Sequence, residues 1–195
     1  MKNIVAICGK SATGKDSLVK DILKKYPKEF HKIISYTTRP MRDNEIDGVD
    51  YFFTTREHII DLISSGDMFE VVNFNDWVYG SCRHSLSDSK INIGVYNLEG
   101  IECLINEKNF NILIFYIETE PKERLLRSLL RENNPDVNEI IRRYNADEKD
   151  FMDIGGFQDS IGGIEFLSLQ NNTLEDYKNV LKNIVIYSMK YFEKN

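Results

Sequence analysis

The nine residues Gly9–Ser17 constrain the fold of this chain more than any other segment. They read Gly-Lys-Ser-Ala-Thr-Gly-Lys-Asp-Ser and directly follow the apolar run Ile4–Cys8. Apolar residues then recur at helical spacing: Leu18, Val19, Ile22 and Leu23. A strand, a glycine-bearing loop and a helix in this order turn backbone N–H groups and a helix N-terminus toward one point, where a phosphate can sit. The segment therefore predicts a nucleotide phosphate-binding loop in an α/β fold.

The residue types in this loop suit that task. Gly9 and Gly14 permit backbone angles and a close approach that a Cβ would obstruct. Lys15 is long enough to reach the β- and γ-phosphates. The residues that we expect to contact the nucleotide phosphates are Gly9, Ser11, Ala12, Thr13, Gly14, Lys15, Asp16 and Ser17.

One position departs from the usual phosphate-loop pattern. Asp16 follows the loop lysine where a serine or threonine is normal, and the hydroxyl comes one residue later at Ser17. A carboxylate beside a triphosphate requires a cation between them, so Asp16 and Ser17 are candidate Mg²⁺ ligands. Alternatively, Asp16 only favours the positive end of the following helix. Both interpretations remain open at this stage.

Composition limits the class of protein. A chain of 195 residues that is 42% hydrophobic can bury one sizeable core with small appended subdomains. Its net charge of −6 argues against a general nucleic-acid or membrane-binding surface, and no apolar run approaches membrane-spanning length. The three cysteines are odd in number and lack metal or redox spacing, which favours a reducing cytoplasm.

The arginines are more informative than the net charge, because a guanidinium group matches phosphate oxygens in shape as well as in charge. Seven of the nine lie in two regions of the chain: Arg39, Arg42, Arg124, Arg127, Arg131, Arg142 and Arg143. We expect Arg124 and Arg127 to pair with neighbouring glutamates on a solvated helix face. The others favour anion binding.

Local patterns predict strands that alternate with helices, interrupted by a region of short strands. The expected strands are 32–36, 51–54, 68–74, 77–80, 91–96, 110–117 and 165–169. The expected helices are 15–26, one capped by Thr54 with Glu57 that ends near Gly66, 98–106, 119–131, 137–151 and one capped by Thr173. Residues 155–163 read as a glycine-rich loop, and the three histidines as structural. These elements predict a twisted parallel sheet with helices on both faces.

A family resemblance becomes visible in residues 35–51, which read Ser-Tyr-Thr-Thr-Arg-Pro-Met-Arg-Asp-Asn-Glu-Ile-Asp-Gly-Val-Asp-Tyr. This segment closely resembles the acceptor-binding signature of guanylate kinases. The resemblance continues in order through Met68-Phe69-Glu70, Tyr79-Gly80-Ser81, an arginine-bearing lid and a strand that ends at Asn171. It implies a three-layer α/β/α P-loop NTPase fold with a parallel sheet, an inserted small mixed-β acceptor-binding lobe and a helical lid. The implied division is a core of 1–34, 90–126 and 146–195, a nucleoside monophosphate lobe at 35–89 and a lid at 127–145.

The resemblance also implies roles for single residues. Those matching the contacts of the GMP phosphate are Arg39, Arg42, Tyr51 and Tyr79, and those matching guanine contacts are Ser35, Glu70 and Ser81. Packing of the two tyrosines in the small lobe is the alternative. Glu45 matches a GMP contact, but it is equally a candidate structural partner of the two arginines. Asn171 matches a residue beside the ATP adenine, and its alternative role is that of a turn residue after a strand. Arg131 and Arg143 match the catalytic lid arginines, with Arg142 as a competitor because residues 133–136 leave the alignment uncertain by one.

Two departures from the family pattern concern residues that are usually aspartates. Val95 stands where a carboxylate would help to order Mg²⁺, and Asn97 stands where a charge would face guanine. Asn97 is still expected to contact GMP through its neutral carbonyl oxygen.

The resemblance implies an enzyme that transfers the γ-phosphoryl group of ATP to GMP or dGMP, with Mg²⁺ as cofactor. Its implied partners are small nucleotides rather than nucleic acid or a membrane, with the chain working as a monomer or homodimer. The run Gly14–Leu18 also resembles ribose 1,5-bisphosphate kinases, so another phosphorylated acceptor is an alternative, as is another nucleoside monophosphate. A non-catalytic or weakly active binding module is a further alternative, although the chain retains the loop lysine and the lid arginines.

Overall fold

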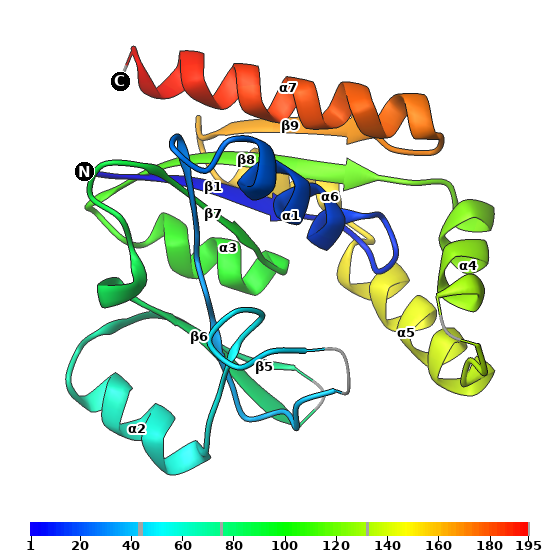
Figure 1. The fold of residues 1–195 in the computed structure, drawn as a ribbon, viewed down its shortest axis with the longest axis horizontal. Helices are drawn as coiled ribbons and strands as arrows, with labels where there is room; N and C mark the ends of the chain where they lie inside the picture. The colour runs from blue at the N-terminus through cyan, green and yellow to red at the C-terminus, as the bar shows by residue number, and fades with distance from the viewer. Residues whose placement is uncertain (43–44, 75, 132, 195) are drawn as a thin grey trace.

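The computed structural model describes residues 1–42, 45–74, 76–131 and 133–194, in which the chain forms two β-sheets (Figure 1). The first sheet has the strand order β2-β7-β1-β8-β9, and all its pairs are parallel. Its strands are β1 Lys2–Cys8, β2 Phe30–Lys32, β7 Ile91–Val95, β8 Phe110–Glu118 and β9 Glu165–Gln170. The second sheet has the order β4-β3-β6-β5 and mixes parallel with antiparallel pairs. Its strands are β3 Tyr36–Thr37, β4 Phe52–Phe53, β5 Met68–Phe74 and β6 Trp77–Cys82.

The parallel sheet is buried on both faces. Successive side chains of a strand point to opposite sides, so Ile4 and Ala6 of β1 join one hydrophobic cluster while Val5 and Ile7 join another. The Val5 face packs against α1 (Lys15–Lys25) and α7 (Leu174–Phe192), and the opposite face packs against α3 (Leu98–Ile105). The predicted α/β fold, a parallel sheet with helices on both faces, is therefore confirmed. Burial on both faces also explains why β1 and β8 read as nearly continuous apolar runs.

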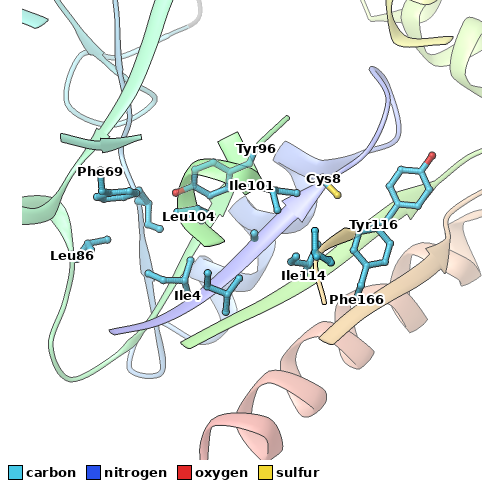
Figure 2. Close-up of a cluster of buried hydrophobic side chains, with 14 of the residues drawn as sticks. Ile4, Cys8, Phe69, Leu86, Tyr96, Ile101, Leu104, Ile114, Tyr116 and Phe166 are labelled. Carbon is cyan, nitrogen blue, oxygen red and sulfur yellow. The ribbon is translucent and has the colours of Figure 1, made fainter. Parts of the chain in front are cut away.

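The second sheet is attached to the core through α3. Phe69 of β5 joins the buried cluster that contains Ile101 and Leu104 of α3 (Figure 2). The Phe69 ring also meets the Phe110 ring edge-on, with 5.0 Å between the ring centroids. Because Glu70 follows Phe69 directly, this packing holds a predicted guanine contact close to the core.

The remaining helices are α2 (Arg56–Ser64), the 3₁₀ turn η1 (Arg83–Ser85), α4 (Pro121–Leu130), α5 (Val137–Asp150) and α6 (Ile154–Ser160). In Figure 1, α4 and α5 lie beyond the arrowheads of the parallel strands. The predicted lid, 127–145, begins inside α4 and ends inside α5. None of the described helices is both long and apolar enough to cross a membrane.

Parallel strands place the predicted site residues at one edge of the sheet. Gly9 follows β1, Asn97 lies just beyond β7, and Asn171 follows β9. Because parallel strands bring their carboxyl ends to the same edge, residues far apart in the chain meet there.

Three local predictions were wrong. The expected strand 32–36 is divided between two sheets: Ile33 N–H still bonds to Ile93 O at 2.9 Å, and the chain then crosses to form β3. Helix α2 is capped by Thr55 rather than Thr54, because the Thr55 hydroxyl accepts from the His58 N–H. Residues 154–160 form α6 instead of a loop, because the Asp153 carboxylate caps this glycine-containing segment.

Candidate active site

Glycine is required at two positions of the phosphate loop. Gly9 has φ 139°, and a Cβ there would lie 2.4 Å from the carbonyl oxygen of Ile117. Gly14 has φ 90°, and a Cβ would lie 2.8 Å from Asn171 Nδ2. Residues with a side chain rarely adopt these backbone angles, and neither position has room for a Cβ atom. The loop therefore depends on both glycines. Ala12, between them, also has a positive φ of 62°.

Lys15 is folded into the loop. Its ammonium group donates to the carbonyl oxygen of Lys10 at 2.7 Å and to Thr13 Oγ1 at 3.4 Å. Burial lowers the pKa of Lys15, and the charges of Asp16 and Asp147 oppose this shift. The lysine is therefore held near the backbone groups that form the phosphate loop, where a bound phosphate would offset its loss of hydration.

Asn171, which follows β9, is hydrogen-bonded to the phosphate loop. Its Nδ2 donates to Thr13 O at 2.7 Å, while its own backbone oxygen accepts from Thr119 Oγ1 and from Arg127. Asn171 is only 1% exposed, and its Oδ1 has no hydrogen-bond partner in the described part of the chain. The residue thus has the structural role that we considered, and a contact with adenine remains a prediction.

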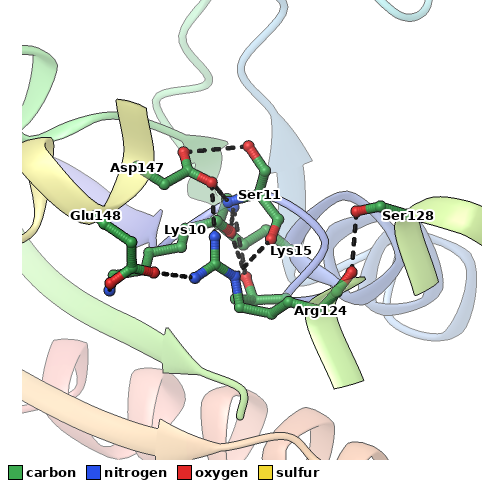
Figure 3. Close-up of polar contacts among 8 residues, drawn as sticks. Lys10, Ser11, Lys15, Arg124, Ser128, Asp147 and Glu148 are labelled. Atoms are coloured by element: carbon green, nitrogen blue, oxygen red, sulfur yellow. Dashed lines mark hydrogen bonds and ion pairs between the residues drawn. The ribbon is translucent and has the colours of Figure 1, made fainter. Parts of the chain in front are cut away.

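Arg124 corrects the expectation of a solvated ion pair. It is 2% exposed, and its guanidinium group donates to Ser11 O at 3.0 Å, Asp147 at 2.8 Å and Glu148 at 2.7 Å (Figure 3). The group also lies 4.7 Å from the centre of the Tyr144 ring.

Arg127 also differs from the expectation of an ion pair with a glutamate, because it donates to the backbone oxygens of Asn171 and Asn172. No local pattern reveals these contacts, because their partners lie on distant segments of the chain.

The loop already binds an anionic group of the protein. The Asp147 carboxylate accepts from the Ser11 N–H at 2.7 Å and from Ser11 Oγ at 3.2 Å (Figure 3). Lys10 pairs with Glu148 at 2.5 Å. These contacts show that the loop presents donors to oxygen anions, and they connect α5 directly to the loop.

A cavity of about 260 Å³ lies beside the loop. Its lining includes Lys10, Thr13, Tyr116, Thr119, Pro121 and Gln170. It therefore lies between the loop, the end of β8, the start of α4 and the end of β9, next to the Asn171 contact. This location suits the nucleoside part of a nucleotide whose phosphates lie in the loop.

The second lobe gathers the residues predicted to hold the acceptor phosphate. Tyr51 and Tyr79 meet with 6.0 Å between ring centroids, and the Arg39 guanidinium group lies 5.6 Å from the Tyr51 ring. Burial raises the pKa of Tyr51 to about 12, so its hydroxyl stays protonated and can donate. Arg42 is exposed and follows Arg39 by three residues in the segment between β3 and β4.

Glu45 binds the two arginine residues. Its carboxylate accepts from Arg39 at 2.7 and 3.0 Å and from the backbone N–H of Arg42 at 2.9 Å. Burial would raise the pKa of Glu45, but the Arg39 hydrogen bond and charge hold it below its usual range. The structure therefore gives Glu45 the structural role, and a direct contact with GMP remains a prediction.

Glu70 is a buried carboxyl group of this lobe with a strongly raised pKa. It is 5% exposed, and its Oε2 has no hydrogen-bond partner among the described residues. Burial raises its pKa to about 7, while a hydrogen bond from Ser81 opposes the shift. Ser81 and Ser35 are themselves hydrogen-bonded through their hydroxyls at 3.0 Å. The three residues predicted to contact guanine are thus neighbours.

The two unusual positions at the end of β7, Val95 and Asn97, differ in their surroundings. Val95 ends the strand, pairs with Ile7 and offers no side-chain oxygen. Asn97 caps α3, and its Oδ1 accepts from the Gly100 N–H at 2.8 Å. The oxygen that we expected to face guanine is therefore engaged in capping the helix.

The candidate lid arginines lie on α4 and α5. Arg131 is the exposed C-cap of α4, while Arg142 bonds to Glu139 at 2.6 and 2.9 Å. Arg143 lies 3.9 Å from the same carboxylate. The pKa of Glu139 is lowered chiefly by its hydrogen bond with Arg142, and the charge of Arg42 contributes. Arg42 is thus within electrostatic range of α5.

Asp16 and Ser17 fit the requirements of a hard cation. Both are exposed in the first turn of α1, and both carry oxygen atoms of the kind that Mg²⁺ prefers. The charge of Asp16 acts on the pKa values of Lys15, Lys32 and Tyr51. Its carboxylate is therefore close enough to Lys15 of the phosphate loop and to Tyr51 of the second lobe to affect their ionisation.

A phosphate loop after the first strand of a parallel sheet, with an inserted second sheet whose lobe brings Arg39, Tyr51 and Tyr79 together, defines a P-loop nucleotide-binding protein. A family model described as guanylate kinase matches residues 1–187. The chain is 33% identical to the guanylate kinase of Thermotoga maritima over 156 residues, which are 77% of this chain and 74% of that protein. It is 30% identical to the human guanylate kinase over 152 residues, 75% of this chain and 76% of that protein. The chain belongs to the guanylate kinase family, as its sequence predicted.

The crystal structure of a guanylate kinase from Anaplasma phagocytophilum has the same fold. It aligns with a TM-score of 0.65 at 18% identity, covering 96% of this chain and 87% of that one. At this identity the likeness supports the fold alone.

Proposed function

We propose that this chain transfers the γ-phosphoryl group of ATP to GMP or dGMP, giving ADP and the nucleoside diphosphate. The observation that carries the choice of guanine is Glu70, a buried carboxyl group with an unpaired oxygen in the second lobe. The N1–H and 2-amino groups of guanine are the donor pair that such a carboxylate would accept. Adenine would instead place an acceptor at N1. Family membership supports the same reaction.

The acceptor phosphate would be bound by two guanidinium groups and two phenols. Arg39 is already oriented by Glu45, and the Tyr51 and Tyr79 rings pack against each other beside it. Arg42 lies in the same segment between β3 and β4 and would supply a second guanidinium group for a phosphate dianion. This arrangement would aim a phosphate oxygen toward the loop near Asp16.

On the donor side, positioning and positive charge are the main requirements of phosphoryl transfer. The loop N–H groups and Lys15 would bind the β- and γ-phosphates. Arg131 with Arg143, or with its neighbour Arg142, would add charge near the transferring group. Asp16 and Ser17 would hold Mg²⁺, which neutralises phosphate charge when it is bound.

Water must be excluded from the site, or ATP would be hydrolysed. We propose that the 35–89 lobe and the 127–145 lid close over the bound nucleotides. The contacts of Asp147 and Glu148 with the loop support a coupling between α5 and nucleotide binding. All residues in this proposal come from one chain, so it is compatible with a monomer or a homodimer that uses free nucleotides in the cytoplasm.

The test is ADP release measured with GMP, dGMP, AMP, dTMP and ribose 1,5-bisphosphate as acceptors. We expect GMP to give the highest kcat/KM, and Glu70→Gln to reduce it far more than Glu102→Gln, a control at an exposed position of α3. Asn97→Asp keeps a helix-capping side chain and adds a charge, so it should lower KM for GMP several-fold. A preference for a non-guanine acceptor, or a neutral Glu70→Gln, would contradict the proposal.

A further inference from the structure

A second group of potential ligands lies at the open end of the β5–β6 pair. It consists of Asp67, which precedes β5, Cys82, the last residue of β6, and His84 in η1. One ligand atom from each, a carboxylate oxygen, the thiol sulfur and an imidazole nitrogen, lie within 4.8 Å of one another. In the described part of the chain, no other group of three such side chains is so placed. None of the three residues has a part in the proposed phosphoryl transfer.

The backbone holds these three residues in place. Met68 pairs with Cys82 in the antiparallel ladder, which fixes the two strand ends relative to each other. The Arg83 N–H donates to Asp67 O at 2.8 Å, and the His84 N–H donates to Asp67 Oδ1 at 3.2 Å. The ligand set is therefore carried by hydrogen-bonded backbone rather than by a free loop, which reduces the entropy lost on binding an ion.

The side chains are also oriented toward a common point. His84 Nδ1 contacts Asp67 Oδ2, and the Cys82 thiol is hydrogen-bonded to the same carboxyl group. On the other side of the imidazole ring, Nε2 lies 3.2 Å from the Tyr36 hydroxyl. In the metal-free chain, the contact between His84 Nδ1 and the Asp67 carboxylate places a proton on Nδ1. A neutral imidazole that binds a metal through Nδ1 carries its proton on Nε2 instead, where the Tyr36 hydroxyl accepts it, so the Nδ1 lone pair then points into the cluster. A histidine that binds a metal usually has such a partner on its other nitrogen.

We propose that Asp67, Cys82 and His84 form a binding site for a thiophilic divalent cation, of which Zn²⁺ is the prototype. One sulfur, one nitrogen and one oxygen ligand suit tetrahedral Zn²⁺, whereas Mg²⁺ and Ca²⁺ favour oxygen alone. The His84 side chain is 51% exposed, so the ion can enter and water can supply the fourth ligand. On binding, the Cys82 sulfur exchanges its proton for the metal, and the proton leaves to solvent.

Such an ion would connect the start of β5, the end of β6 and η1. It would therefore stabilise the second lobe next to Ser81, one residue from the ligand Cys82. Because a ligand that binds only the folded state raises the thermal midpoint, binding should be visible without any nucleotide.

The experiment is a titration of the full-length chain with Co²⁺ as a spectroscopic probe, followed by displacement with Zn²⁺. We expect one Co²⁺ per chain, a thiolate-to-cobalt charge-transfer band, tetrahedral d–d bands and a raised thermal midpoint. Cys82→Ser should abolish the charge-transfer band, and His84→Gln should weaken binding at least ten-fold. The matched controls Cys103→Ser and His58→Gln should bind as the parent chain does.

Because Cys82 is fully buried, its substitution could disturb folding, whereas His84 is exposed and His84→Gln should fold normally, as checked by circular dichroism. If Cys82→Ser does not fold, His84→Gln alone decides the question. Absence of a thiolate band in the parent chain, or equal binding by His84→Gln and the parent, would overturn the proposal. Loss of binding in Cys103→Ser would also overturn it, by assigning the metal to another site.

Discussion

The buried carboxyl group of Glu70 should make GMP binding depend on pH near neutrality. Burial raises the pKa of this group from its usual 4.5 to about 7, and the nearby charge of Glu99 contributes to the rise. The guanine N1–H and 2-amino groups bind the ionised form, because a charged acceptor makes the stronger hydrogen bonds. GMP should therefore bind more tightly as the pH rises through 7, and bound GMP should lower the pKa of Glu70.

The size of the effect follows from the ionised fraction. For a pKa near 7, that fraction rises from roughly one-tenth at pH 6 to roughly nine-tenths at pH 8, so the affinity should increase about ten-fold. The free protein should show the opposite trend in stability. The folded state holds the Glu70 proton more tightly than the unfolded state does, so this group costs stability as the pH rises from 4.5 to about 7. The loss should approach ~3 kcal/mol, which Glu70→Gln would avoid.

The assay is calorimetric titration of GMP into the wild type and into Glu70→Gln at pH 6, 7 and 8. The phosphate of GMP itself titrates near pH 6, and the variant measures that background because it retains the phosphate site. Urea unfolding of both proteins at the same pH values gives the stability comparison. Parallel pH profiles for the wild type and the variant would refute the reasoning, since neither the binding nor the stability would then depend on the Glu70 proton.

Three further predictions concern the loop. Lys15→Ala should lower kcat by ~10²-fold or more, about 3 kcal/mol of charge stabilisation, with a smaller effect on ATP binding; a near-normal kcat in steady-state assays would contradict the phosphate-loop assignment. Asp16→Ser should raise the Mg²⁺ concentration needed for half-maximal rate, whereas an unchanged Mg²⁺ dependence would favour the helix-terminus interpretation. Arg124→Met should cost about 3–5 kcal/mol in urea unfolding, because it leaves the carboxylate of Asp147 buried without its guanidinium partner. Asp147→Asn in the Arg124→Met background should recover part of that loss, and a cost below about 1 kcal/mol for Arg124→Met alone would show that the buried pair is dispensable.

The parts that the sequence predicted are those set by local patterns. A glycine-bearing loop between an apolar strand and a helix is a short-range signal, and Gly9 and Gly14 turned out to be required by backbone angle and space. Thr173 was correctly assigned as a helix cap, because a cap and its partner Asp176 lie three residues apart. The continuous apolar runs of β1 and β8 indicated a sheet that is buried on both faces.

Local sequence patterns predicted the wrong element where one segment is compatible with two structures. The strand expected at 32–36 satisfies strand propensity throughout, and only the positions of β7 and β6 divide it between two sheets. The glycines at 155 and 156 suggested a loop, yet Asp153 caps a helix there. The cap of α2 shifted by one residue because Thr54 and Thr55 are adjacent and both are capable of capping.

By itself, the sequence determined which chemical groups the chain carries and in what order, and hence the P-loop and the acceptor signature. Only the tertiary structure decided the environment of those groups. Arg124 and Asp147 are buried together because α4 and α5 pack at the phosphate loop. The Glu70 side chain is shielded from water because β5 packs on α3. Asp67, Cys82 and His84 lack any metal-binding spacing in the sequence, and they meet because the β5–β6 ladder brings two strand ends together. Desolvation and charge pairing depend on atoms that are distant along the chain, so they arise only when the chain has folded.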